Sequence, residues 1–125
     1  MVNVDLKAHK ILKLTYCNEK NTQEQNIQIE STLSTNANYD TKSSLCFCTY
    51  VLTMASTSKK SDFKIEIKLV GIFSYSTQDE KKEVHLESAK QLYPILQSTL
   101  SNLLRNANLS DIKLPEFNLT INDVQ

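Results

Sequence analysis

The only glycine of the chain, Gly71, lies inside a segment that otherwise has the pattern of a β-strand. In residues 63–75 the apolar side chains first occupy odd positions, from Phe63 to Leu69, with charged residues between them. This alternation is typical of a strand with one buried face. At residues 70–72 both parities become apolar. A glycine at such a point predicts a bulge, a bend or a close backbone approach, and we expect the strand geometry to break there.

Residues 45–55 add a second constraint, because they are apolar on both parities. Leu45, Phe47 and Val51 share one parity, while cysteines and Tyr50 share the other. A strand of this kind is covered on both faces. One helix can cover only one face of a small sheet, so the second face is predicted to contact another subunit or to form a groove for an apolar ligand.

Two further strands are predicted before these segments. The first spans residues 3–17, and Ile11, which departs from the even-position pattern of its neighbours, indicates a bulge. The second is carried by Ile27, Ile29 and Leu33. The polar segments 18–26 and 36–44 are expected as a loop and a turn. Short connections between the last three strands indicate an antiparallel meander.

One long helix is predicted from about Tyr93 to Asn106, because the apolar residues in this range follow helical spacing. Pro94 would then be the first helical residue, where its missing N–H costs nothing. The segments around the helix are expected to be less regular: a charged loop at 77–82, a strand end or helical turn at 84–89, and an extended tail at 112–121.

The composition limits the class of protein. At 125 residues the chain suits one domain with one modest core, and we expect residues 1–125 to form it. Fourteen Lys and Arg residues balance fourteen Asp and Glu residues, which argues against nucleic acid as a partner. A hydrophobic content of 40% without a long apolar run argues against disorder and membrane insertion. No secretory signal pattern opens the sequence, so we expect a cytoplasmic location.

The residues that could carry chemistry are few and scattered. Cys46 and Cys48 share one face of a strand, about 7 Å apart by strand rise, but Cys17, His9 and His85 show no ligand spacing around them. Buried structural cysteines are therefore predicted, with metal or redox chemistry as the alternative. His85 lies between two glutamates and could act as a general base, although a solvated histidine in a charged turn is the favoured interpretation. Without a nucleophile elbow or a glycine-rich phosphate loop, we expect no enzyme activity, no cofactor and no metal.

Three short segments occur in an informative order: GIFS at residues 71–74, LYPI at 92–95 and LPEFNL at 114–119. They resemble a strand, the start of the long helix and the closing motif of SecB, the tetrameric export chaperone family of bacteria. The resemblance implies an α+β fold, SecB-like, with a four-stranded antiparallel sheet and one long helix packed on one face.

The resemblance also implies a homotetramer, or at least a dimer, that holds unfolded polypeptide clients without ATP. Such clients would bind hydrophobic surface grooves, where aromatic and flexible side chains suit many sequences. The groove candidates are Phe47, Tyr50, Met54, Phe73 and Tyr75. For each of them the alternative is a place in the core or in a dimer interface.

Other functions stay open. The chaperone could serve a few dedicated clients, such as an antitoxin, rather than general export. The same fold could instead act as a structural or interaction protein without chaperone activity. A small-molecule binding module is a third possibility, and it would need an enclosed pocket.

The sequence departs from SecB at the positions that engage the translocase motor SecA. Of the family's acidic positions only Glu66 has a clear counterpart, and Lys13 and Cys17 occupy places that are acidic in the family's first strand. Lys64 replaces an apolar contact, and Glu116 replaces the second proline of the closing motif. We expect no counterpart of the family's C-terminal helix and acidic tail. Glu66 is thus the one translocase-contact candidate, and binding to SecA is predicted to be weak or absent.

Overall fold

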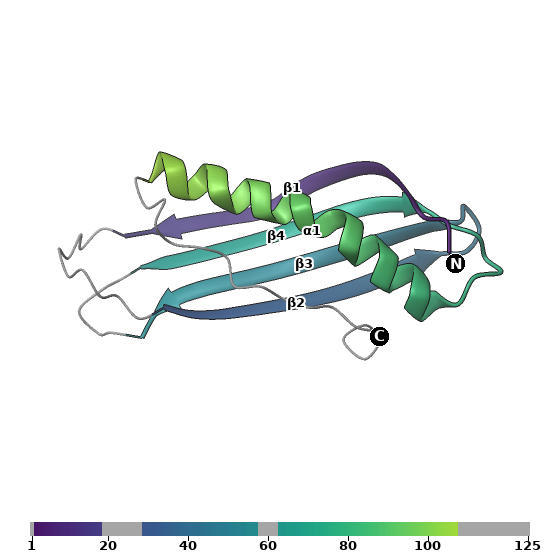
Figure 1. The fold of residues 1–125 in the computed structure, drawn as a ribbon, viewed down its shortest axis with the longest axis horizontal. Helices are drawn as coiled ribbons and strands as arrows, with labels where there is room; N and C mark the ends of the chain where they lie inside the picture. Colours follow the sequence, from purple (N-terminus) through teal and green to yellow (C-terminus); the bar gives the residue numbers. More distant parts are fainter. Residues whose placement is uncertain (1, 19–28, 58–62, 108–125) are drawn as a thin grey trace.

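The computed structural model describes residues 2–18, 29–57 and 63–107, which form an antiparallel sheet covered on one face by a long helix (Figure 1). The elements in chain order are β1 (Asp5–Cys17), β2 (Ile29–Asp40), β3 (Leu45–Ser56), β4 (Lys64–Ser74) and α1 (Lys81–Asn106). The four strands lie in the order β1-β4-β3-β2. This arrangement confirms the predicted α+β fold, with one long helix on a four-stranded sheet.

The pairing of the strands leaves β1 and β2 at the two edges of the sheet. β2, β3 and β4 form the predicted antiparallel meander, and β1 pairs with the other side of β4. Figure 1 shows α1 crossing the sheet diagonally, from β2 at its N-terminal end towards β1 at its C-terminal end. Tyr39 of β2 fixes the start of the helix by donating a hydrogen bond of 2.7 Å to the Lys81 carbonyl. The helix contacts mainly β3 and β4, so the core lies over the middle of the sheet.

The two apolar parities of β3 face opposite sides of the sheet, as its sequence predicted. One parity is buried under α1: Cys46, Cys48, Tyr50, Leu52 and Met54. The other, which includes Phe47 and Val51, is half-buried on the opposite face, called the outer face below. Among the described residues no element covers the outer face (Figure 1).

The second strand continues further than predicted. Residues 36–40, expected in a polar turn, pair residue by residue with β3 up to Asp40 and Leu45. Ala37 and Tyr39 pack against the core, so alternate residues of this otherwise polar segment make apolar contacts on the buried face of the sheet. The turn is confined to residues 41–44. There the Asp40 carboxylate accepts hydrogen bonds from the N–H groups of Lys42 and Ser43, at 3.1 and 3.4 Å, and Ser44 is left-handed with a φ of 57°.

The predicted break of the strand at Gly71 is wrong. β4 alternates regularly through this point, Gly71 pairs with His9 on one side and Cys48 on the other, and no glycine has a positive φ. The reason for the glycine is space. A Cβ at this position would lie 2.7 Å from a ring carbon of Phe73 and 2.8 Å from a methyl carbon of Leu92 on α1. The structure therefore supports none of the three explanations as stated: the atoms that approach Gly71 belong to the side chains of Phe73 and Leu92, not to another backbone.

The helix begins much earlier than predicted, at Lys81, and Pro94 lies inside it. The segment 84–89, expected as a strand end or a turn, is therefore helical. Its buried side continues the i, i+4 spacing of the later helix: Val84, His85, Ser88, Ala89, Leu92, Leu96, Leu100 and Leu104. Because His85 and Ser88 are polar, they interrupt the apolar spacing in this half of the helix, and the sequence pattern therefore did not predict it. Pro94 is tolerated because it lies on the exposed side of α1, where water can hydrate the carbonyl of the equally exposed Lys90.

The expected irregularity of the first strand is confirmed. β1 has register shifts against β4 between Leu6 and Ala8 and between Ile11 and Lys13. The second shift leaves Leu12 without an opposite residue, at the point where the sequence indicated a bulge.

Some predicted segments lie outside the described residues: most of the 18–26 loop, the 112–121 tail and the LPEFNL motif. Within the described part of the chain, no helix has the length and hydropathy needed to cross a membrane.

Candidate functional site

Four predicted groove residues lie in the core between α1 and the sheet, not at the surface. Tyr50, Met54, Phe73 and Tyr75 are all buried. Tyr50 is also fixed by a hydrogen bond of 2.8 Å from its hydroxyl to the Ala89 carbonyl of α1. Burial raises the pKa of this hydroxyl above its usual range, so it stays a protonated donor. Packing in the core, the alternative that the sequence left open, accounts for these four side chains.

The fifth groove candidate, Phe47, lies on the outer face, and the sheet separates it from the other four. It is half-buried and pairs with Ile72 of β4 and Asn38 of β2. The five residues therefore do not form one groove in the folded chain.

Glu66, the translocase-contact candidate, lies on the outer face next to lysines of its own chain. Its carboxylate is 2.9 Å from the Lys13 ammonium and 4.0 Å from the Lys64 ammonium. The hydrogen bond from Lys13 lowers the pKa of Glu66, with the positive charges of Lys13 and Lys64 acting in the same direction. The residue is thus an ionised carboxylate whose charge is already balanced within the chain.

The sequence did not single out the large apolar side chains that are exposed, which, among the residues that the structure describes, all belong to β1. Ile11, Leu12, Leu14 and Tyr16 have exposed fractions of 44%, 47%, 49% and 37%. Ile11, Leu14 and Tyr16 point to the same side as α1, because each pairs with a buried residue of β4. They are exposed because α1 lies mainly over β3 and β4 and β1 is at the sheet edge. The apolar run at residues 11, 12 and 14 was the available signal, but the alternation of a strand does not reveal whether the strand is at an edge.

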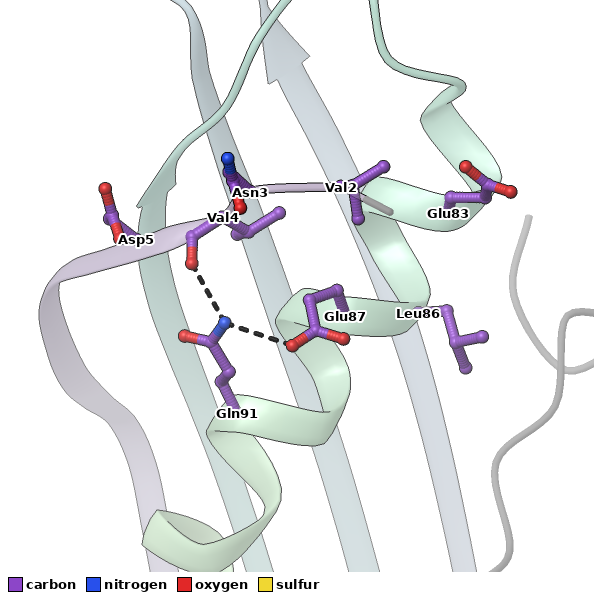
Figure 2. A pocket seen from close by; sticks show the side chains of 8 residues that line it. All are labelled: Val2, Asn3, Val4, Asp5, Glu83, Leu86, Glu87 and Gln91. Carbon is purple, nitrogen blue, oxygen red and sulfur yellow. Dashed lines mark hydrogen bonds between the residues drawn. The ribbon is translucent and has the colours of Figure 1, made fainter.

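An open cavity of about 780 Å³ lies between the N-terminal segment and the first half of α1 (Figure 2). Its lining mixes apolar, acidic and amide side chains: Val2, Asn3, Val4, Asp5, Glu83, Leu86, Glu87 and Gln91. Gln91 links its two walls, donating hydrogen bonds of 2.9 Å to the Val4 carbonyl and 3.3 Å to the Glu87 carboxylate. The cavity is open and largely polar, so it is not the enclosed pocket that a small-molecule binding module would need.

His85 is fully buried, which corrects the expectation of a solvated histidine in a charged turn. Because the helix extends back to Lys81, position 85 falls on its buried side. The Nε2 atom is 3.0 Å from the Thr35 hydroxyl of β2, and this hydroxyl is 3.7 Å from the Cys48 sulfur. The histidine therefore belongs to a polar contact that joins α1 to the edge of the sheet.

The predicted structural role of Cys46 and Cys48 is supported by their burial and their protonation. Both are fully buried, and none of the three cysteines forms a disulfide. Burial raises the pKa of the Cys48 thiol to about 12 and that of Cys46 in the same direction. Thiols in this state are poor nucleophiles and poor ligands at neutral pH. Among the described residues no three His, Cys, Asp or Glu side chains lie together as a metal site.

The comparisons with known proteins identify the fold. No protein-family model matches the sequence, and no curated protein matches it. The chain is similar in structure to the Mycobacterium tuberculosis SecB-like chaperone Rv1957, solved in complex with a peptide from the antitoxin HigA1. The TM-score is 0.70 at 12% identity, over 91% of this chain and 90% of that one. A Streptococcus agalactiae protein of unknown function matches with a TM-score of 0.43 at 15% identity, over 95% of this chain and 99% of that one. The likeness to Rv1957 shows that the fold is SecB-like.

Proposed function

We propose that this protein is a SecB-like holdase, which binds unfolded polypeptide without ATP and assembles as a homo-oligomer. The carrying observation is the row of exposed apolar side chains on β1, on a fold shared with a SecB-like chaperone. The neighbour's complex with an antitoxin peptide supports polypeptide as the ligand class. A client restricted to one or a few proteins is compatible with this, as is a cytoplasmic location.

The proposed contact surface consists of Ile11, Leu12, Leu14 and Tyr16 of β1. Such side chains bind apolar segments of many sequences, because the hydrophobic effect has no directional requirement. The core residues Tyr50, Met54, Phe73 and Tyr75 would support this surface from below rather than touch a client, and Phe47 would belong to the outer face.

The same strand is the proposed site of self-association. β1 is long and lies at the edge of the sheet, and its backbone edge opposite β4 has no strand partner among the described residues. Long exposed edge strands are templates for pairing with other chains, and the stretch from Lys13 to Cys17, which follows the second register shift, is the longest part of β1 without a bulge. A dimer through β1 would be a step towards the tetramer that the SecB resemblance implies.

A second candidate function is a SecB-like interaction protein without holdase activity. It is favoured by the position of the predicted groove residues in the core, which leaves fewer apolar side chains for clients. In that case the β1 surface would be occupied by a second copy.

The test is suppression of aggregation of a thermally unfolded model protein, without ATP, by the wild type and by a Leu14→Ser, Tyr16→Ser variant. The matched control is Thr49→Ser, Thr53→Ser on the outer face of β3. We expect suppression by the wild type and the control, and loss of suppression in the β1 variant. Sedimentation measures the oligomeric state of all three proteins, so that a loss of client binding can be distinguished from a loss of self-association. An oligomer that does not suppress aggregation would favour the second candidate function, and a monomer that does not suppress it would contradict both.

A further inference from the structure

The outer face of the sheet carries an apolar stripe with lysines along one side only. The strand pairing places its residues in rows across the sheet, in the order β1, β4, β3, β2. Three neighbouring rows in the middle are Ala8-Ile72-Phe47-Asn38, Lys10-Val70-Thr49-Asn36 and Lys13-Lys68-Val51-Ser34. The apolar stripe consists of Phe47, Val51, Val70 and Ile72, all half-buried. Its β1 side is basic, and its β2 side is polar and uncharged.

The positive charge on the β1 side is not balanced within the described part of the chain. Lys10, Lys13, Lys64 and Lys68 are all exposed on this half of the face, and Glu66 is the acidic residue among them. Glu66 contacts Lys13 and Lys64, whereas Lys10 and Lys68 form no ion pair with any described residue. The other outer-face carboxylates, those of Asp5, Asp40 and Glu30, lie in the rows at the strand ends.

The pairing of Lys13 with Lys68 is itself a sign of a missing partner. The two residues are directly opposite each other on neighbouring strands. Like charges in this position destabilise a sheet. Lys13 turns towards Glu66, which leaves the Lys68 ammonium as an exposed donor beside Val51 and Val70.

We propose that the outer face binds an acidic amphipathic helix of a partner protein, with carboxylates along one side of its apolar stripe. The carboxylates would pair with Lys10 and Lys68, and the apolar stripe would cover Phe47, Val51, Val70 and Ile72. A sheet that is apolar on both faces is completed by a layer on each face, and α1 supplies only one of them. The stripe from Phe47 to Val51 is about 13 Å long by strand rise, which corresponds to about nine helical residues.

A protein helix fits this surface better than nucleic acid does. Nucleic-acid surfaces combine a strong positive field with aromatic side chains for base stacking. Here the chain is neutral as a whole, and Phe47 is the one aromatic residue of the apolar stripe. The aliphatic side chains beside the lysines instead match a helix with an apolar centre and one charged flank.

The test uses a fluorescent synthetic peptide of about 16 residues, with leucines at i, i+3, i+4 and i+7 and glutamates along one flank. A second peptide carries lysines in place of the glutamates. Fluorescence anisotropy measures the affinity of both for the wild type and for a Lys10→Gln, Lys68→Gln variant. The matched control is Lys82→Gln, Lys90→Gln, which removes two exposed lysines from α1 on the other side of the sheet.

We expect the acidic peptide to bind the wild type more tightly than the basic one. Two exposed ion pairs of about 0.2 to 1 kcal/mol each correspond to a roughly two- to thirty-fold loss in the Lys10, Lys68 variant, with no change in the control. The methyl NMR signals of Val51, Val70 and Ile72 should shift when the peptide is added, which tests the surface in the unmutated protein. Equal or absent binding of both peptides would overturn the proposal, as would methyl shifts confined to β1 and α1. Displacement of the peptide by an RNA oligonucleotide at equal concentration, or a changed oligomeric state of the Lys10, Lys68 variant, would point to a different occupant and overturn it as well.

Discussion

Replacement of Gly71 by valine should destabilise the protein, because the space above this glycine is already filled. A Cβ there would lie 2.7 Å from Phe73 and 2.8 Å from Leu92, well inside ordinary carbon contact distances. Both neighbours are fully buried, so neither can move aside without displacing the core. The backbone is not the source of the cost, because Gly71 has no positive φ.

The expected magnitude follows from two opposing effects. Overpacking a well-filled core costs typically about 1 to 3 kcal/mol, and the two further methyl groups of valine add to the crowding. A side chain in place of glycine returns about 0.4 to 1 kcal/mol by restricting the unfolded chain. We expect Gly71→Val to lower the free energy of unfolding by roughly 1 to 3 kcal/mol, and Gly71→Ala by about 1 kcal/mol.

Urea unfolding followed by circular dichroism measures this change, with Ser74→Thr on the outer face of the same strand as the control. The control adds a methyl group where no helix covers it, and should stay within about 0.5 kcal/mol of the wild type. Combining Gly71→Ala with Leu92→Ala should cost less than the sum of the single changes, because the two side chains compete for one space. A neutral Gly71→Val, or strict additivity with Leu92→Ala, would refute the assignment of this glycine to close helix approach.

Three further predictions concern the helix and the core. Pro94→Ala should raise the free energy of unfolding by about 1 to 3 kcal/mol, since it restores the hydrogen bond to the Lys90 carbonyl; an unchanged urea midpoint would contradict this. Tyr50→Phe should lower it by about 1 to 3 kcal/mol, because the donor to the buried Ala89 carbonyl is lost, and a midpoint equal to that of the wild type would show that the hydrogen bond contributes nothing. Cys48, with a pKa raised from 9.0 to about 12 by burial, binds its proton more tightly in the folded than in the unfolded state. The stabilisation from the buried thiol is therefore complete below about pH 9 and lost as the pH rises towards 12. Cys48→Ala should flatten the fall of stability over this range by at most about 1.4 kcal/mol per pH unit, and equal slopes would exclude the thiol as the cause.

The sequence predicted the layers of this fold because alternation and helical spacing report burial directly. The two parities of β3 showed that both faces of the sheet need cover, and the leucines after residue 95 identified the helix. The first half of α1 was not predicted, because the polar residues His85 and Ser88 occupy buried positions that are apolar in an ordinary amphipathic helix. Their burial is made possible by contacts with β2 and β3, which no local pattern contains.

The candidate site was harder to predict, because it depends on the order of the strands. Tyr50 and Phe73 are residue types that are common in binding grooves, but the sheet and α1 enclose them. Leu14 and Tyr16 are residue types that are common in a core, but β1 lies at the edge of the sheet, where the helix does not cover it. Gly71 shows the same limit. Glycine is favoured both at a bulge and where a helix packs closely on a strand, and only the position of the Leu92 side chain distinguishes the two cases.

The most direct test of holdase activity is binding of a permanently unfolded protein, reduced and carboxymethylated so that it cannot refold. Calorimetric titration without nucleotide, at low and high salt and at several temperatures, measures both the affinity and the heat-capacity change. Holding through the apolar side chains of β1 predicts binding with a negative heat-capacity change, an affinity that high salt does not weaken, and a loss of affinity in Leu14→Ser, Tyr16→Ser. Absence of binding, or binding that high salt abolishes, would contradict a holdase that works through an apolar surface.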